Sequence, residues 1–134
     1  MSRVLLVDDD EPLRKMLKFS LQKMGHVVDE ARNGDEALRL CESEPPDLVL
    51  TDIIMPDKEG LGTILEIRQT YPHLKIIAMS GGGRTSSVDY LKIARRLGAT
   101  HTLEKPFSYD DLNTAITKAM APGAPPNLIR PDPL

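Results

Sequence analysis

Short apolar runs alternate with amphipathic segments along most of this 134-residue chain, and this alternation restricts the possible folds more than any other feature. Five runs resemble strands, at about 4–7, 27–28, 47–51, 75–79 and 100–103. Helical spacing of apolar residues follows each run, at about 12–24, 35–42, 61–70, 86–97 and 108–120. Strands that alternate with helices form parallel sheets with helical crossovers. We therefore predict an α/β fold, a three-layer α/β/α sandwich around a five-stranded parallel sheet with flavodoxin-like topology.

Residues near the ends of the predicted helices support these boundaries. Pro12 falls in a first helical turn, where its missing N–H has no partner in any case. Gly25 and Gly98 can each end a helix, and Ser108 can cap the start of the last one. The inward face of the first helix is expected to carry Leu13, Met16, Leu17, Leu21 and Met24.

Length and composition indicate one globular domain over residues 1–120. The content of 40 % hydrophobic and 28 % charged residues is ordinary for such a domain. A net charge of -3 offers no basic surface for direct nucleic-acid binding. No apolar run reaches the roughly 18 residues of a membrane span, and we expect no signal peptide, because the sequence runs directly into the first strand. With a single cysteine, Cys41, expected to be a packing residue, we predict a cytoplasmic protein.

The segment 121–134 differs from the rest because it is rich in proline and has little to bury. It is predicted to be a flexible C-terminal tail or the start of a linker to a further domain.

Polar residues stand at the ends of four of the predicted strands. Asp8-Asp9 follows the first strand, Asp52 the third, Ser80 the fourth, and Lys105 closes the fifth. The carboxyl ends of parallel strands share one edge of the sheet, where ligands bind, so these residues should converge. Three carboxylates, a hydroxyl and an ammonium suit a divalent metal and a phosphoryl group. Taken singly, each residue has another interpretation. Asp52 could be a solvated acid in a turn, Ser80 a turn residue at the end of a strand, and Lys105 an ordinary surface lysine.

The ordered set of these motifs resembles the receiver domain of bacterial two-component response regulators. The resemblance rests on Val7-Asp8-Asp9, Asp52 followed by Met55-Pro56, Ser80-Gly81 and Lys105-Pro106-Phe107, and it covers about residues 3–120. It implies a signalling switch rather than an enzyme, of the chemotaxis-regulator-like, stand-alone kind. A receiver fragment of a longer DNA-binding regulator is the alternative.

The resemblance also implies roles for the acidic residues. Asp52 matches the phosphoacceptor, Asp9 the direct metal ligand and Asp8 its outer-sphere partner. The backbone carbonyl of Ile54 would supply a further ligand to Mg²⁺ or Mn²⁺. Arg14 sets this register, because an arginine recurs in the family five places after the ligand carboxylate. Asp10 is then an exposed or helix-capping acid.

Lys105 and Ser80 would contact the phosphoryl oxygens, and the bond before Pro106 would be cis, as in the family. An aliphatic residue at Ile54 cannot position a hydrolytic water, so we expect a phospho-form that lasts minutes or more. Thr102 stands where receivers often carry an aromatic switch residue. We therefore expect rearrangement of the loop at residues 81–83 to carry the signal.

Partners follow from the same resemblance. A sensor histidine kinase or phosphotransfer protein would donate the phosphoryl group, and a downstream effector protein would receive the signal. The fourth helix, with Tyr90, Lys92, Arg95 and Arg96, is one candidate surface for docking or for phosphorylation-dependent dimerisation. The first helix, with Arg14, Lys15 and Lys18, is the alternative surface, for a histidine kinase or phosphotransfer protein.

A Mg²⁺-dependent phosphohydrolase that forms an aspartyl phosphate is the alternative from the enzyme class. Enzymes of the haloacid dehalogenase type place the nucleophile after the first strand, with a second acid two residues later. Here Asp52 follows the third strand, and Ile54 occupies the later position. Flavin binding is disfavoured, because the acidic run Asp8–Glu11 would repel a phosphate.

Overall fold

The computed structural model describes residues 2–53, 60–81 and 87–121, and the side chains of 60 and 87–91 are not part of that description. Its strands are β1 (Arg3–Val7), β2 (Val27–Ala31), β3 (Leu48–Asp52), β4 (Lys75–Gly81) and β5 (His101–Lys105). Its helices are α1 (Glu11–Lys23), α2 (Gly34–Ser43), α3 (Gly60–Thr70), α4 (Ser87–Leu97) and α5 (Tyr109–Met120). This order confirms the predicted alternation of strands and helices.

The five strands form one parallel sheet in the order β2-β1-β3-β4-β5. This order is that of the flavodoxin-like fold, as predicted. Three strands run at least two residues further than the apolar pattern indicated. β2 continues through Asp29 and Glu30, β4 through Ser80 and Gly81, and β5 through Glu104 and Lys105.

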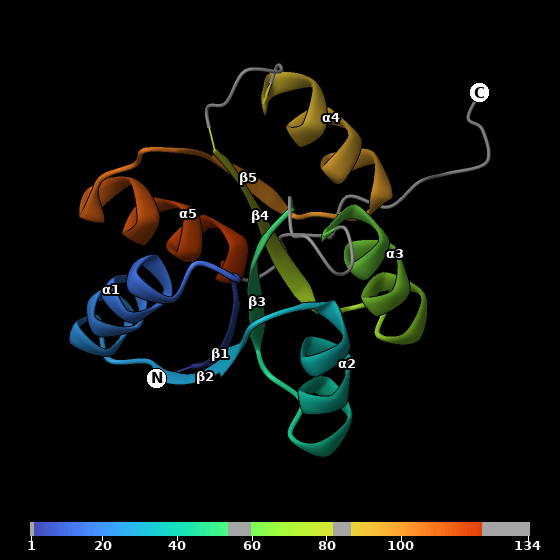
Figure 1. Ribbon diagram of the computed structural model, residues 1–134, viewed down its shortest axis with the longest axis horizontal. Coiled ribbons are helices and arrows are strands. Elements are labelled where there is room, and N and C mark those ends of the chain that lie inside the picture. Colours follow the sequence, from blue (N-terminus) through green and yellow to red (C-terminus); the bar gives the residue numbers. More distant parts are fainter. Residues whose placement is uncertain (1, 54–59, 82–86, 122–134) are drawn as a thin grey trace.

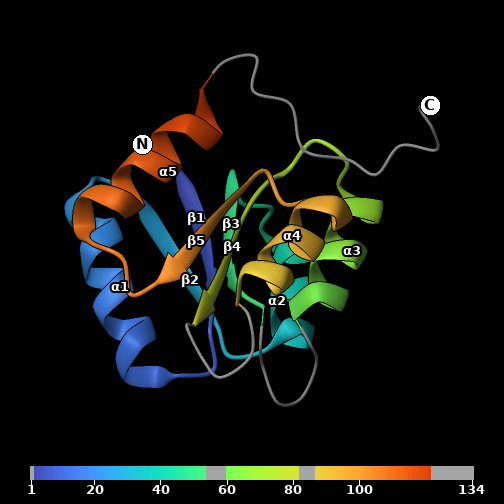
Figure 2. The same cartoon turned by 90° about the horizontal axis from the view of Figure 1, so that it is seen from above.

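Helices cover both faces of the sheet, with α1 and α5 on one face and α2, α3 and α4 on the other (Figures 1 and 2). Side chains alternate between the faces along each strand, as the pleat requires. Leu5 and Val49 therefore pack under α2 and α3, in one buried cluster. Leu6 and Leu50, their neighbours in sequence, pack under α1 and α5 in the other. The two clusters hold the three layers together.

The ends of the helices agree with the predicted signals. Gly25 and Gly98 have φ values of 99° and 128°, a region that L side chains rarely adopt. Ser108 caps α5 and forms a capping box with Asp111. One prediction for α1 is wrong, because Met16 is 60 % exposed rather than inward. Cys41 is buried, as expected for a packing residue, and burial raises the pKa of its thiol to about 11.

Among the described residues, no helix combines the length and apolar character that crossing a membrane requires. The predicted tail lies outside the described residues from 122 onward.

Candidate phosphoryl-acceptor site

Three carboxylates meet at the carboxyl edge of the sheet, where the sequence predicted them. Asp8 and Asp9 follow β1, and Asp52 is the last residue of the neighbouring strand β3. Each of the three offers an oxygen, and these oxygens all lie within 4.8 Å of one another. Asp8 is fully buried and Asp52 is 7 % exposed, whereas Asp9 is exposed. A buried position excludes the interpretation of Asp52 as a solvated turn acid.

Asp8 is fixed through both its backbone and its side chain. Its N–H donates to the carbonyl of Ala31 in β2 (3.1 Å), and its carbonyl accepts from Nη1 of Arg14 (2.8 Å). Its Oδ1 accepts from the backbone N–H of Asp10 (2.9 Å). Asp10 in turn caps α1 by accepting from the N–H of Leu13, which confirms its expected role as a capping acid. The acidic loop therefore has a defined conformation before any ligand binds.

Lys105 brings a positive charge to the carboxylates from the end of β5. Its Nζ lies 3.2 Å from Oδ2 of Asp8 and 3.6 Å from Oδ2 of Asp52. The peptide bond between Lys105 and Pro106 is cis, as expected. Attraction to the ammonium offsets part of the repulsion among the acids, which is roughly 1 to 4 kcal/mol for each pair. This lysine thus lies at the site rather than on open surface.

Ser80 supplies the hydroxyl that the sequence predicted at the end of β4. Its Oγ is buried and has no hydrogen-bond partner among the described residues. Buried hydroxyls are nearly always paired, so an orphan of this kind marks a place where a ligand atom can complete the hydrogen bond.

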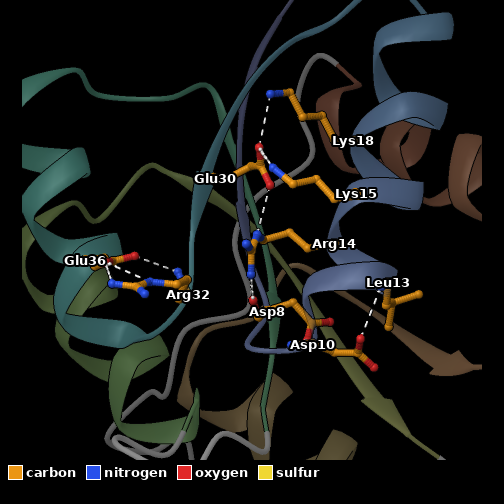
Figure 3. Close-up of polar contacts among 9 residues, drawn as sticks. All are labelled: Asp8, Asp10, Leu13, Arg14, Lys15, Lys18, Glu30, Arg32 and Glu36. Carbon is orange, nitrogen blue, oxygen red and sulfur yellow. Dashed lines mark hydrogen bonds and ion pairs between the residues drawn. The ribbon is translucent and has the colours of Figure 1, made fainter.

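Arg14 behaves differently from the sequence prediction that placed it on a docking surface. It is only 6 % exposed, and its Nε donates to Oε1 of Glu30 in β2 (2.9 Å) while Nη1 holds Asp8 (Figure 3). Lys15 and Lys18 also contact the Glu30 carboxylate, at 3.1 and 3.0 Å. The expected basic docking face of α1 is therefore wrong for Arg14, and its two lysines are engaged with Glu30.

The Glu30 carboxyl has a strongly shifted pKa. Burial on its own would raise this pKa, but hydrogen bonds from Arg14, Lys18 and Lys15 outweigh burial and lower it to about 2. Sequence reasoning missed Glu30, because it follows the apolar pair that marked β2. The sequence did contain a signal for it, because Glu30 follows the predicted β2 strand and the preceding helix α1 carries cations that need an anionic partner.

Three of the predicted features fall on residues outside the described ranges. Ile54 and Met55-Pro56 lie there, as do the second and third glycines of the predicted loop at 81–83. The half-buried Thr102 lies in β5, at the position where receivers often carry an aromatic switch residue.

The donor set fits a hard divalent cation. Carboxylate oxygens are the ligands that Mg²⁺ and Mn²⁺ prefer, and no sulfur or imidazole belongs to the cluster among the described residues. The ammonium of Lys105 and the orphan hydroxyl of Ser80 suit the oxygens of a phosphoryl group. Chemically, the site can hold a metal beside a carboxylate that faces an incoming phosphoryl group.

Comparison with known proteins identifies the family. The family model of the response regulator receiver domain matches residues 4–117. The chain therefore belongs to the receiver domains of response regulators, the phosphorelay switches of two-component systems.

Individual relatives agree with the family match. The DNA-binding transcriptional regulator NtrC of Azospirillum brasilense is 33 % identical over 129 residues, which is 96 % of this chain and 26 % of that protein. This chain thus spans about a quarter of that relative's length. A receiver domain protein of Clostridium thermocellum is 31 % identical, with a TM-score of 0.82 over 90 % of this chain and 94 % of that one. The response regulator TrrA of Thermotoga maritima, solved in complex with Mg²⁺ and BeF, is 35 % identical, with a TM-score of 0.79 over 90 % of this chain and all of that one.

Proposed function

We propose that Asp52 accepts a phosphoryl group from a phosphohistidine of a partner protein. The observation that carries this proposal is the convergence of Asp52 with two further carboxylates and the Lys105 ammonium at one edge of the sheet. A carboxylate oxygen of Asp52 would form the new P–O bond while the P–N bond to the imidazole breaks. The released imidazole takes up a proton, and the product is an acyl phosphate. The protein would act as a switch, and catalysis would be limited to its own phosphorylation and dephosphorylation.

Asp9 and Asp52 would hold Mg²⁺ or Mn²⁺ directly, with the backbone carbonyl of Ile54 as a further ligand and Asp8 as outer-sphere partner. The exposed position of Asp9 beside two buried carboxylates supports this assignment, since it leaves one side open to water and phosphate. The bound metal would neutralise charge that builds up on the phosphoryl oxygens. The presence of Mg²⁺ in the TrrA complex is consistent with the choice of ion.

Lys105 and Ser80 would receive the phosphoryl group once it is attached. The ammonium of Lys105 already lies within 3.6 Å of Asp52 and can rotate toward a phosphoryl oxygen. The Ser80 hydroxyl would donate its unused hydrogen bond to another of these oxygens. Both contacts form only after phosphorylation, so they would stabilise the phosphorylated state relative to the free one.

Partner proteins would recognise the phosphorylated state at the face formed by α4, β5 and α5. Lys92, Arg95 and Arg96 are exposed on α4. A hollow of about 350 Å³ lies between β5 and α5, and Thr102 and Phe107 are among its lining residues. We propose that this face contacts a downstream effector or a second copy of the chain, and that a histidine kinase or phosphotransfer protein supplies the phosphoryl group. A place within a longer DNA-binding regulator, the class of the NtrC relative, is the alternative to a domain that acts alone.

The decisive experiment is intact-mass analysis after incubation with acetyl phosphate and Mg²⁺. Wild type should gain one phosphoryl group, and Asp52→Asn should gain none. Asp10→Asn is a matched control, because it changes a neighbouring acid and retains an oxygen that can cap α1. An adduct that persists in Asp52→Asn would refute the assignment of the acceptor. A phospho-form that decays within seconds would contradict the long lifetime predicted from Ile54.

A further inference from the structure

The backbone N–H of Asp8 is bonded directly to the end of β2, and the backbone carbonyl of Asp8 is linked to β2 through Arg14 of α1. The Asp8 N–H donates to the carbonyl of Ala31, and the Asp8 carbonyl accepts from Arg14. Arg14 is itself held by Glu30, the residue before Ala31 in β2. The hydrogen bonds and the chain between Glu30 and Ala31 thus close a ring that starts and ends at Asp8. Figure 3 shows the part of this ring that runs from Asp8 through Arg14 to Glu30. This ring fixes the residue from which the acidic loop departs.

The guanidinium of Arg14 is suited to this role because two of its nitrogens point to two different acceptors. Nε reaches Oε1 of Glu30 at 2.9 Å, and Nη1 reaches the Asp8 carbonyl at 2.8 Å. A lysine has one nitrogen and could not hold both acceptors in the same geometry. The side chain is almost fully buried, so water cannot replace either contact without rearrangement.

Glu30 also balances a positive charge that would otherwise stand next to the metal site. Arg14 is bonded to the backbone carbonyl of Asp8, so its charge lies next to a residue of the carboxylate cluster. An unbalanced guanidinium there would repel a divalent cation. The Glu30 carboxylate lies on the other side of Arg14, and Lys15 and Lys18 hold it in place.

We propose that Arg14 is a positioning residue for the acidic loop, and that Glu30 holds Arg14 in place and balances its charge, so that a divalent cation can bind at Asp8, Asp9 and Asp52. This inference rests on the proposed function, because it assigns the metal to these carboxylates. It adds two residues that do not touch the metal or the phosphoryl group.

The test compares Mg²⁺ binding, measured by calorimetry, in wild type and in Arg14→Ala, Arg14→Lys and Glu30→Gln. We expect the dissociation constant to rise about tenfold or more in Arg14→Ala, and by a smaller factor in Arg14→Lys. Glu30→Gln retains an acceptor for Arg14 and loses the charge. The affinity of Glu30→Gln for Mg²⁺ should be several-fold lower than that of wild type at low ionic strength. This difference should shrink as salt is added.

A second readout uses the metal-free protein. The Asp10 N–H donates to the Asp8 carboxylate, so its hydrogen exchange reports the order of the loop. Exchange should accelerate in Arg14→Ala and Arg14→Lys. Arg32→Ala is the matched control, because it removes a cation that forms an exposed ion pair with Glu36.

If Arg14→Ala does not fold, Arg14→Lys tests whether Arg14 positions the acidic loop. A folded Arg14→Lys with Mg²⁺ affinity within twofold of wild type and unchanged Asp10 exchange would overturn the inference. Neither readout needs a phosphoryl donor. A wild type that binds Mg²⁺ but gains no phosphoryl group would therefore overturn the proposed function alone. Unchanged Mg²⁺ binding in folded Arg14 variants, beside normal phosphorylation of wild type, would overturn this inference alone.

Discussion

The ammonium of Lys105 lies 3.2 Å from the buried carboxylate of Asp8, so the end of β5 is joined to the end of β1 across the site. Two strands intervene between them in the sheet, and both also end at this edge. The contact places the Lys105 ammonium against the carboxylate that would lie beside the metal. Removal of the Lys105 ammonium should therefore have two separate effects, one on the free energy of unfolding and one on the rate of phosphorylation.

Lys105→Met removes the ammonium and keeps most of the aliphatic side chain. Without metal, we expect a loss of about 1–3 kcal/mol in the free energy of unfolding, because Asp8 loses a charged partner while buried. The rate of phosphorylation by acetyl phosphate should fall at least about tenfold, even at saturating Mg²⁺. Urea denaturation and time-resolved intact mass measure the two effects. A variant with wild-type rate would remove Lys105 from the phosphoryl site.

Addition of Mg²⁺ should raise the melting temperature of wild type. For a dissociation constant of about 1 mM, 10 mM Mg²⁺ contributes about 1.4 kcal/mol by mass action. Asp9→Asn is the informative variant, because this exposed residue can change with little effect on the metal-free fold. Its melting temperature should respond much less to Mg²⁺. A wild-type melting temperature unmoved by millimolar Mg²⁺ would count against the metal assignment.

Gly98→Ala should destabilise the protein more than Gly25→Ala. Both glycines have positive φ, so each alanine carries backbone strain of about 1–2 kcal/mol. At Gly98 the new Cβ would also lie 2.8 Å from Cγ of Arg68, whereas at Gly25 it meets nothing within 4 Å. The difference between the two variants in urea denaturation therefore measures the steric conflict, which we expect to add about 1 kcal/mol or more. Equal losses would show that Arg68 moves aside freely.

Arg68 has little freedom to move away from a new Cβ at position 98. It is buried, and its guanidinium donates to the carbonyls of Gly98, Tyr71 and Pro72. Burial lowers the pKa of its guanidinium to about 10, which leaves it charged at neutral pH. It therefore joins the end of α3 to the turn after α4.

The contribution of Glu30 to stability should depend on pH. Its pKa is about 2 in the folded protein and 4.5 in the reference state, so its stabilising effect is complete above about pH 5. The effect is lost as pH falls from 4.5 toward 2, where protonation removes the charge. The full effect is up to about 3 kcal/mol before screening by solvent and salt. Urea denaturation of wild type and Glu30→Gln between pH 3 and 6 should show the difference shrinking toward low pH.

Glu42→Gln serves as control for this experiment, because it changes an exposed acid of α2. It should shift stability by less than about 0.5 kcal/mol at every pH tested. A constant gap between wild type and Glu30→Gln over the whole range would contradict the assigned ionisation of Glu30.

The sheet and the site carboxylates were predictable because each depends on a local pattern. Buried parallel strands are apolar throughout, so the runs at β1, β3 and β4 stood out. The residues at or next to their carboxyl ends had to lie at one edge of the sheet, which placed Asp8, Asp52 and Ser80 there. Local signals were sufficient for these features.

β2 and α1 show where local patterns fail. β2 is an edge strand with only one hydrogen-bonded neighbour, and it carries Asp29 and Glu30 among its residues. These carboxylates are stabilised by Arg3 and by the cations of α1, which are distant in sequence. Apolar periodicity does not detect such pairs. It also placed Met16 inward, although the packing of α1 leaves this side chain exposed.

The ring through Asp8, Arg14 and Glu30 constrains the number of residues that precede Glu30 in β2 more than it constrains the identity of those residues. Side chains alternate between the two faces of a strand, so one residue inserted between Val27 and Glu30 would turn the carboxylate away from α1. Arg14 would then keep its charge and lose the partner that balances it. We expect the residues before Glu30 in β2 to accept many substitutions, while a single insertion or deletion among them weakens metal binding several positions away from any ligand.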